Sequence, residues 1–370
     1  MTSAKKTVTT TTTTKTVRDG SKTIITKTVT TNTSLTTFDY SVPDTMKAVT
    51  FSSYGSSADV LEHVELPTPK LADNDTLSVI IKVVSAGVNP VDYKIVKGYL
   101  SAYLPMPVPA IPGADYSGII VQVGSSVTLF NVGDKVYGKT AKPNGYGPYA
   151  EYIKVNSQTD LVTHMPASIS FNEAGGISLA ALTAYVGLAT YDGLNKDAYY
   201  NKDKKVLVIG ASGGVGMWAV QIAKRLGASV TAVASSRNKD FVLNTLKADA
   251  FIDYTQASLA EQFTTADEFD VIYDSIGADI TSNWDLAQLI LKPGGLFVSP
   301  AGSVKTTDAD TRRFKFVAQL PVSEFPQIAG WVAEGSVTPI TTLALHLSEA
   351  KKAHELSASG RTVGKIVLNP

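Results

Sequence analysis

The chain of 370 residues contains no cysteine, only four histidines and no excess of charge. Without cysteine there are no disulfides, no thiolate nucleophile and no zinc or iron–sulfur site built on thiolates. The four histidines lack metal-binding spacing, so we expect no metal. Lysine plus arginine and aspartate plus glutamate are 33 each, and the zero net charge gives no argument for a nucleic-acid partner. No apolar run approaches the roughly 20 residues of a membrane-spanning helix.

Threonine is abundant instead, and it is concentrated at the start of the chain. The first 37 residues hold 17 threonines in recurring KTV and KTI units, with six basic residues and one acidic residue. We predict that residues 1–42 are a disordered low-complexity tail, because they lack the apolar side chains for a core. A basic, hydroxyl-rich segment is also typical of a transit peptide. We therefore expect a cytoplasmic protein, with the mitochondrion as the alternative if the tail is such a peptide.

Beyond the tail, the hydrophobic pattern changes twice along the chain. Short apolar runs broken by glycine and proline predict strands at 46–51, 78–88, 118–124, 132–138 and 149–155. After about residue 165 helical and strand patterns alternate, which is typical of a parallel sheet covered by helices. We expect an α/β protein with a β-rich domain over 43–165 and 335–370, and a doubly wound parallel sheet over 166–334.

The strongest local motif is KKVLVIGASGGVGMWAVQIAKRLGASV at 204–230. A buried strand at 206–209 runs into glycines 210, 213 and 216, and an amphipathic helix and a second strand follow. Glycine lets the backbone approach a pyrophosphate, and the helix N-terminus offers it free N–H groups. The motif predicts a dinucleotide site whose phosphate contacts come from Ser212, Gly213, Gly214 and Val215.

The residues after the second strand indicate which dinucleotide binds. An NAD site usually has Asp or Glu there for the ribose 2′-hydroxyl, whereas residues 235–239 read Ser-Ser-Arg-Asn-Lys. Ser236, Arg237 and Lys239 can bind a 2′-phosphate through charge-assisted hydrogen bonds, so we predict NADPH. The alternative is that they only begin a solvated helix. Tyr254, after the third strand, is expected to pack on the adenosine.

Two further loops are expected at the nicotinamide. Ligands bind at the carboxyl ends of strands in such sheets. The loops at 275–277 and 299–302 follow the fourth and fifth strands, and they place Ile276 and Ser299 there.

Together these motifs resemble the zinc-independent medium-chain dehydrogenase/reductase family, and most of all its quinone oxidoreductases of the zeta-crystallin, chloroplast-envelope and mitochondrial reticulon-interacting types. The resemblance covers roughly residues 46–370. The motifs that carry it are AGVNPVDYKIVKG (86–98), IPGADYSGIIVQVGSSVTLFNVGDKVYG (111–138), LAALTAYVGL (179–188), GASGGVGMWAVQIAK (210–224) and GRTVGKIVL (360–368).

The resemblance implies a GroES-like catalytic domain, a Rossmann domain and a cleft between them. It implies cofactor contacts by Asn89, Lys94, Thr183 and Lys365. It also implies a homodimer, for which the apolar strand at 294–302 is the candidate edge. One departure from the family pattern is Pro148, which interrupts the usual GGYAEY sequence beside the cleft.

Without a metal, the chemistry that NADPH supports best is hydride transfer to an electrophilic carbon of a quinone or an α,β-unsaturated carbonyl. Tyr93, Lys94 and Tyr149 are the candidate groups that stabilise or protonate the resulting oxyanion. The partner is then a small molecule. A different class of function remains open, an NADPH-binding regulatory or interaction protein with little turnover. An enoyl reductase for acyl chains differs chiefly in the length of its cleft.

Overall fold

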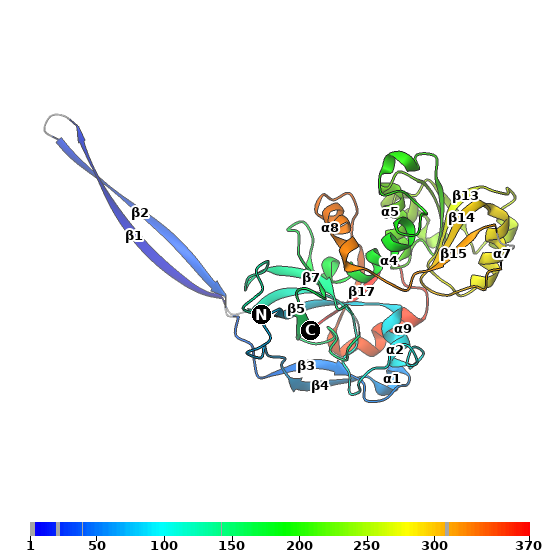
Figure 1. The fold of residues 1–370 in the computed structure, drawn as a ribbon. Coiled ribbons are helices and arrows are strands. Elements are labelled where there is room, and N and C mark those ends of the chain that lie inside the picture. Colours follow the sequence, from blue (N-terminus) through cyan, green and yellow to red (C-terminus); the bar gives the residue numbers. More distant parts are fainter. Residues whose placement is uncertain (1–3, 20–22, 39, 142, 308–310) are drawn as a thin grey trace.

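The computed structural model describes residues 4–19, 23–38, 40–141, 143–307 and 311–370. Figure 1 shows two lobes and a long two-stranded hairpin that extends from them. The hairpin consists of β1 (Ala4–Asp19) and β2 (Thr23–Phe38), which pair antiparallel along their whole length. The sequence analysis predicts disorder for this segment, whereas the structure contains two paired strands. Alternating threonine and valine favour extended backbone even where no core is available.

The β-rich lobe is built on a seven-stranded sheet in the order β16-β17-β5-β6-β7-β9, with β8 paired to β5, and a separate pair β3-β4. Its strands are β3 (Thr45–Thr50), β4 (Glu62–Pro67), β5 (Ser78–Val88), β6 (Asp115–Val123), β7 (Lys135–Lys139), β8 (Tyr152–Asn156), β9 (Leu161–His164), β16 (Thr341–His346) and β17 (Lys365–Asn369). Its helices are α1 (Ser57–Val60), α2 (Pro90–Val96), α3 (Phe171–Gly175) and α9 (Ala350–Ala358). The last strand, β17, pairs antiparallel with the end of β5, so the two chain segments meet in one sheet.

The α/β lobe is built on a six-stranded parallel sheet in the order β12-β11-β10-β13-β14-β15. Counted along the chain this is the order 3-2-1-4-5-6 of dinucleotide-binding sheets, and its switch point lies between β10 and β13. The strands are β10 (Lys205–Ile209), β11 (Ser229–Ala234), β12 (Ala250–Asp253), β13 (Phe269–Asp274), β14 (Leu291–Ser299) and β15 (Arg313–Phe316). The helices are α4 (Ser178–Ala189), α5 (Gly216–Arg225), α6 (Leu259–Gln262), α7 (Ile280–Ile290) and α8 (Phe325–Ala333). Short helical turns lie at Ala198–Asn201, Ser236–Asn238, Phe241–Thr245, Val322–Glu324 and Leu347–Glu349.

Both faces of the parallel sheet are buried, which explains its continuous apolar strands. One face packs against α4, α5 and α8 around Trp218, and the other packs against α7 around Trp284. A separate core fills the β-rich lobe around Tyr116 and Tyr149. The predicted fold class is therefore confirmed.

Two details of the predicted organisation need comment. Helix α3 lies after the predicted domain boundary at residue 165 but contacts β5 and β6 of the β-rich lobe. The domain limits therefore stay predictions. Strand β14 pairs on one side with β13 and on the other with β15. The segment 294–302 is thus internal to the sheet, and the expectation of a free edge there is wrong. The sequence analysis did not predict β15 as the neighbour of β14, because β15 is only the four residues Arg-Phe-Lys-Phe.

Candidate active site

The glycine loop joins β10 to α5 and can be formed only by glycine at two positions. Gly210 has a φ of 78°, and an added Cβ would lie 2.5 Å from Cδ1 of Ile276. At Gly216, an added Cβ would lie 2.1 Å from the carbonyl oxygen of Gly210. Gly210 is required by its positive φ, because the Ile276 side chain could move away from an added Cβ, whereas at Gly216 the backbone oxygen of Gly210 excludes any side chain. The predicted strand–loop–helix unit is therefore present in the structure.

The loop offers backbone donors to an anion. Among the described residues, the N–H groups of Gly214, Val215 and Gly216 have no hydrogen-bond acceptor. They lie at the N-terminus of the ten-residue helix α5, where the helix dipole favours negative charge. This donor set fits the pyrophosphate of a dinucleotide.

The side chains predicted for the 2′-phosphate lie together at the end of β11. Ser236, Arg237 and Lys239 are exposed, whereas Asn238 between them is buried and donates to the Ser212 hydroxyl at 3.0 Å. This bond joins the 2′-phosphate candidates to the glycine loop. Tyr254, at the end of the neighbouring strand, has 56% of its surface exposed and is free to cover a base.

Sequence reasoning missed a carboxylate at this point. Asp253 ends β12, and hydrogen bonds from Thr255 and then Ser236 hold the pKa of its carboxyl below its usual range. No acidic residue follows β11 directly, but the adjacent strand β12 places one carboxylate, that of Asp253, beside the proposed 2′-phosphate residues. Parallel pairing of Ala234 with Asp253 brings it there, and this register depends on strand neighbours that a local sequence pattern does not specify.

The loops at the carboxyl ends of β13 and β14 differ in exposure. Ile276 is 48% exposed over Gly210, and its N–H donates to the buried Asp274 carboxylate at 2.9 Å. Ser299 is fully buried, and its hydroxyl accepts the Ala301 N–H at 3.1 Å. Ile276 is thus available to a ligand, whereas Ser299 shapes the loop behind it.

Lys365 connects the glycine loop with the β-rich lobe. The N–H of Gly364 donates to the Ser212 carbonyl at 2.9 Å, and a Cβ added to Gly214 would lie 3.1 Å from Cδ of Lys365. The buried Lys365 ammonium donates to Asn89 Oδ1 at 2.6 Å and to the Val88 carbonyl at 2.8 Å. The side chain of Lys365 therefore contacts the phosphate loop through its methylene stem and the end of β5 through its ammonium group.

Asn89 is linked through Asp115 to α4, the helix that carries Thr183. Its amide donates to Asp115 Oδ2 at 3.0 Å, and the other Asp115 oxygen accepts the Leu179 N–H at the start of α4 at 2.8 Å. One turn later, Thr183 donates to the Leu179 carbonyl at 2.6 Å and its own carbonyl accepts the Tyr273 hydroxyl. The predicted residues Asn89, Thr183 and Lys365 thus belong to one hydrogen-bonded chain.

Four buried ionisable side chains lie around Asn89 and its partner Asp115, namely Asp92, Asp115, Lys139 and Lys365. Lys139 lies opposite Asp115 across the β6–β7 pair. Burial raises the pKa of both carboxyls, that of Asp92 to about 7, and it lowers the pKa of both ammonium groups, while each lysine is attracted to Asp115. Two positive and two negative groups in one place limit the penalty of removing them from water.

The three predicted acid or base residues are placed differently. Tyr93 and Lys94 are half-buried on α2, and burial, with a contribution from Tyr99, raises the pKa of the Tyr93 hydroxyl. Tyr149 is fully buried with its ring 5.7 Å from that of His354, and its hydroxyl donates to Asp92 Oδ2 at 3.1 Å. The sequence analysis therefore identified Tyr149 as a candidate but not Asp92, the acid to which its hydroxyl donates.

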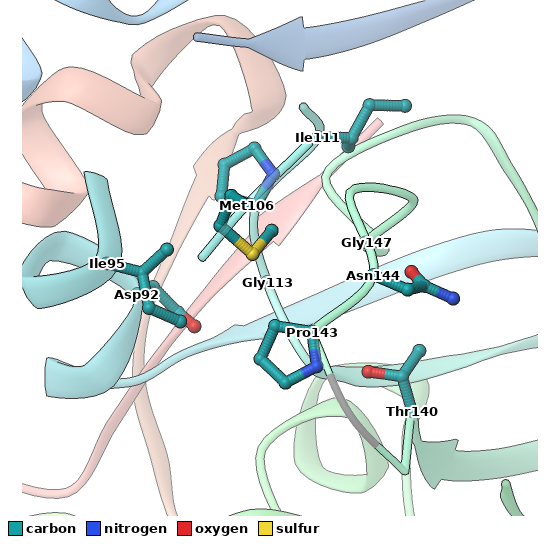
Figure 2. A pocket seen from close by; sticks show the side chains of 10 residues that line it. Asp92, Ile95, Met106, Ile111, Gly113, Thr140, Pro143, Asn144 and Gly147 are labelled. Atoms are coloured by element: carbon teal, nitrogen blue, oxygen red, sulfur yellow. The ribbon is translucent and has the colours of Figure 1, made fainter. Parts of the chain in front are cut away.

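Figure 2 shows a cavity between α2 and two loops of the β-rich lobe. The residues that line it are Asp92, Ile95, Met106, Ile111, Pro112, Gly113, Thr140, Pro143, Asn144 and Gly147. The loop that contains Pro148 is held by the Gly147 N–H on the Ile111 carbonyl at 2.9 Å and the Tyr149 N–H on the Pro112 carbonyl at 3.3 Å. The departure at Pro148 therefore leaves a fixed cavity wall, mostly apolar apart from Asp92, Thr140 and Asn144.

Neither a metal cluster nor a membrane-spanning helix occurs in the described part of the chain. Within the described ranges, no three His, Asp or Glu side chains gather to hold a metal ion. Over the same part of the chain, no helix combines the length and apolar character needed to cross a bilayer.

Comparisons with known proteins agree with this geometry. The family model described as Alcohol dehydrogenase GroES-like domain matches residues 75–167, and the one described as Zinc-binding dehydrogenase matches 246–368. The 2-methylene-furan-3-one reductase of Solanum lycopersicum is 34% identical over 90% of this chain and 82% of its own. Quinone-oxidoreductase QR1, chloroplastic, of Triphysaria versicolor is 33% identical over 88% of this chain and 98% of its own. The solved Escherichia coli quinone oxidoreductase complexed with NADPH has a TM-score of 0.73 and 26% identity, covering 88% of this chain and 100% of that one.

Proposed function

The chain belongs to the quinone oxidoreductase group of the medium-chain dehydrogenases/reductases, and on that premise we propose that it reduces quinones and α,β-unsaturated carbonyl compounds with NADPH. The names of its relatives support both substrate types, a furanone reductase for the enones and a quinone oxidoreductase for the quinones. The solved relative with bound NADPH supports the choice of cofactor. The absence of cysteine excludes the thiolate-bound zinc of the alcohol dehydrogenases in this family.

The observation that carries the proposal is the position of Lys365. Its stem contacts Gly214 of the phosphate loop, and its ammonium binds Asn89, next to the cavity residue Asp92. A dinucleotide bound at the loop is thereby connected to the interior of the β-rich lobe by one hydrogen-bonded network. Such an arrangement suits a transfer between two bound molecules, where positioning supplies much of the rate.

We assign the cofactor as follows. The loop N–H groups hold the pyrophosphate, Ser236, Arg237 and Lys239 hold the 2′-phosphate, and Tyr254 covers the adenine. Ile276, Thr183, Asn89 and Lys94 are the residues that would contact the nicotinamide half of the cofactor. When bound, NADPH supplies the hydride, and the protein orients it and keeps water out. Lys94 and Tyr93 are candidates to stabilise the developing oxyanion.

The test is a titration of the purified protein with NADPH and with NADH, followed by steady-state assays with a simple benzoquinone and with an aliphatic enone. We expect tighter binding of NADPH and turnover of both substrates. Turnover of neither compound by protein that binds NADPH would overturn the proposed reduction. Equal affinity for the two cofactors would overturn the assignment of the 2′-phosphate residues alone.

Two further assignments are proposals of the same standing. We propose a homodimer, and because β14 is internal the exposed edge strand β15 replaces it as the candidate interface; light scattering of the purified protein tests the assembly. We also propose a cytoplasmic location. The relative QR1 is named chloroplastic, so the location needs imaging of the tagged chain with and without residues 1–42.

A further inference from the structure

Asn238 is a buried side chain within the segment that carries the proposed 2′-phosphate residues. This segment, residues 235–239, follows β11 and is called here the 2′-phosphate turn. Its members Ser236, Arg237 and Lys239 are exposed, whereas only 9% of the Asn238 surface is exposed. A polar side chain is buried where its hydrogen bonds are satisfied, so the contacts of Asn238 indicate its role.

Asn238 is hydrogen-bonded to the glycine loop. Its Nδ2 donates to the Ser212 hydroxyl at 3.0 Å and to the Ser235 hydroxyl at 3.4 Å, so both amide hydrogens are used within the protein. The Ser212 oxygen accepts in this bond, and among the described residues its own O–H has no acceptor. That hydrogen is therefore available to a phosphate oxygen of a ligand. Asn238 thus joins the 2′-phosphate turn to a proposed phosphate contact.

The loop and the turn are also joined where they leave the sheet. Strands β10 and β11 are parallel neighbours, and the N–H groups of Gly210 and Ala211 donate to the Val233 carbonyl at 3.1 and 3.0 Å. Farther from the sheet, the bond from Asn238 to Ser212 is the one side-chain hydrogen bond between the two segments in the part of the chain that the structure describes. This single bond therefore fixes the separation of their outer ends.

A fixed separation matters because NADPH carries two anionic groups on one adenosine. Its pyrophosphate would bind the N–H groups of the loop, and its 2′-phosphate would bind Ser236, Arg237 and Lys239. When the two sites are held at the spacing of the ligand, the second contact requires little further ordering. When the sites can move apart, each still binds its own group, but the advantage of binding both is lost. NADH has no 2′-phosphate and gains nothing from the spacing.

We propose that Asn238 is a positioning residue that determines the preference for NADPH, because it fixes the distance between the pyrophosphate site and the 2′-phosphate site. The inference rests on the proposed function, which assigns those two sites. Asn238 acts through Ser212 and does not itself bind the cofactor. The loop end of the link is held from a second side, since the Gly364 N–H donates to the Ser212 carbonyl at 2.9 Å. The turn is therefore the part that moves when the link is removed.

The first experiment measures the affinities of NADPH, NADH and 2′-AMP for the unchanged protein and for Asn238→Ala. NADPH binds both sites, NADH binds only the pyrophosphate site, and 2′-AMP binds only the 2′-phosphate site. We expect the affinity for NADPH to fall by about five- to tenfold, as for one lost hydrogen bond, and the other two affinities to change by less than about twofold. Nicotinamide fluorescence reports the two dinucleotides, and competition with NADPH reports 2′-AMP.

The other outcomes of this experiment overturn the proposal. An equal loss for NADPH and NADH would show that Asn238 supports the glycine loop alone. An equal loss for NADPH and 2′-AMP would show that it shapes the 2′-phosphate turn alone. A loss shared by all three ligands would show a general loss of structure, and unchanged affinities would show that the spacing does not depend on Asn238.

Asn201→Ala is the matched control for the loss of a buried amide. Asn201 has 1% of its surface exposed, and its Nδ2 donates to the Asn195 and Leu226 carbonyls at 2.7 and 2.8 Å. It lies shortly before β10, near the edge of the sheet opposite to the glycine loop. We expect this variant to lose stability and to keep the ratio of NADPH to NADH affinity. If the ratio falls as far as in Asn238→Ala, it reports stability and not spacing, and the proposal fails.

A second set of variants tests the bond itself, and it decides the question even if Asn238→Ala does not fold. Ser212→Ala removes the hydroxyl that accepts from Asn238. Any direct contact of this hydroxyl with the pyrophosphate is lost for NADPH and NADH alike, so a fall in the ratio of their affinities reports the link. We expect a fall of about five- to tenfold, and an unchanged ratio would contradict the proposal.

The double variant Ser212→Ala/Asn238→Ala completes the test. Because Ser212→Ala already lacks the link, adding Asn238→Ala should lower the ratio by less than about twofold more. A second full loss would show that Asn238 acts by another route, which overturns the proposal.

These measurements separate the inference from the function on which it rests. Equal affinity of the unchanged protein for NADPH and NADH would remove the assignment of the 2′-phosphate residues, and the inference falls with it. A clear preference for NADPH that survives Asn238→Ala would overturn the inference alone. Neither result depends on the turnover of quinones or enones.

Discussion

The glycine loop and the buried charge cluster lie on either side of the same proposed cofactor, and they are built in opposite ways. The loop comes from consecutive residues, 210–216, and consists almost wholly of backbone. The cluster is assembled from a helix and the ends of three strands far apart in the chain, and its parts are side chains: Asp92 on α2, Asp115 on β6, Lys139 on β7 and Lys365 on β17. The first is a local structure that any such strand and helix can form, and the second exists only when the whole β-rich lobe is folded.

This difference predicts different responses to substitution. In the loop, the limiting factor is space, so adding atoms does the damage. In the cluster, the limiting factor is charge balance, so removing one charge does the damage even when the new side chain fits. The predictions below test that contrast, beginning with the largest effect.

Gly216→Val should abolish cofactor binding. The first atom it adds would lie 2.1 Å from the Gly210 carbonyl oxygen, so the loop and α5 must separate. We expect NADPH affinity to fall beyond measurement and stability to fall by about 3 kcal/mol, as in overpacked cores. Fluorescence titration and denaturant unfolding measure the two effects.

The matched control is Gly330→Ala on α8, where an added Cβ meets no atom within 4 Å. Alanine in a helix interior should raise stability slightly, by under about 1 kcal/mol, without changing NADPH affinity. If Gly216→Val binds NADPH as well as this control does, steric exclusion is not what fixes the loop.

Lys365→Met should destabilise the β-rich lobe by about 3–5 kcal/mol, because it leaves Asp92 and Asp115 buried with only Lys139 opposite them. The control is Lys352→Met, which removes an exposed partner of Glu349 and should change stability by under about 1 kcal/mol. Equal unfolding free energies for the two variants would contradict the idea that charge balance holds the cluster. Methionine keeps the stem that lies against Gly214, so lost packing does not explain a large effect.

The same contrast explains what could be predicted from the sequence. The glycine spacing, the strand at 78–88 and the basic residues after β11 are local signals, and the structure has all of them. Asp92 and Asp253 were missed because their importance depends on which strands lie side by side. Asn89 and Lys365 were found only through a family resemblance, since 276 positions separate the two residues whose side chains bind each other. Strand β15 was missed because its alternation of basic and aromatic side chains extends over only four residues.

Acid should destabilise the β-rich lobe through His354. Burial lowers the pKa of this histidine to about 4, whereas the unfolded chain titrates near 6.5, so the unfolded state binds more protons between these values. Its contribution to stability is therefore complete above about pH 6.5 and is lost as the pH falls to about 4. Asp92 acts in the opposite direction, because its folded pKa is raised, and stability from its bound proton is lost as the pH rises toward 7.

His354→Gln removes the histidine contribution and leaves those of the carboxyl groups unchanged. Between about pH 6.5 and 4, the unfolding free energy of the variant should rise by about 3 kcal/mol relative to the unchanged protein. Urea unfolding at several pH values measures this change. A constant difference across the range would show that His354 does not titrate differently on unfolding.

The smallest expected effect concerns Asp253, whose carboxylate lies beside the side chains proposed to bind the 2′-phosphate. Its carboxylate accepts hydrogen bonds from Thr255 and Gln256 and is partly exposed, so water and salt screen it. It should still oppose a 2′-phosphate held by Ser236, Arg237 and Lys239. Asp253→Asn is expected to raise the preference for NADPH over NADH by a few-fold, under about tenfold, with the gain shrinking as salt increases.

The exposed Asp73→Asn in the β-rich lobe is the control for the change in net charge, and it should leave the preference unaltered. Arg237→Ala should move the preference in the direction opposite to Asp253→Asn. If Asp253→Asn instead weakens NADPH binding, the carboxylate acts by fixing the Ser236 hydroxyl rather than by repulsion. The cofactor side would then depend on side chains from neighbouring strands just as the buried cluster does, and the distinction between a local and an assembled site would hold only for the phosphate loop itself.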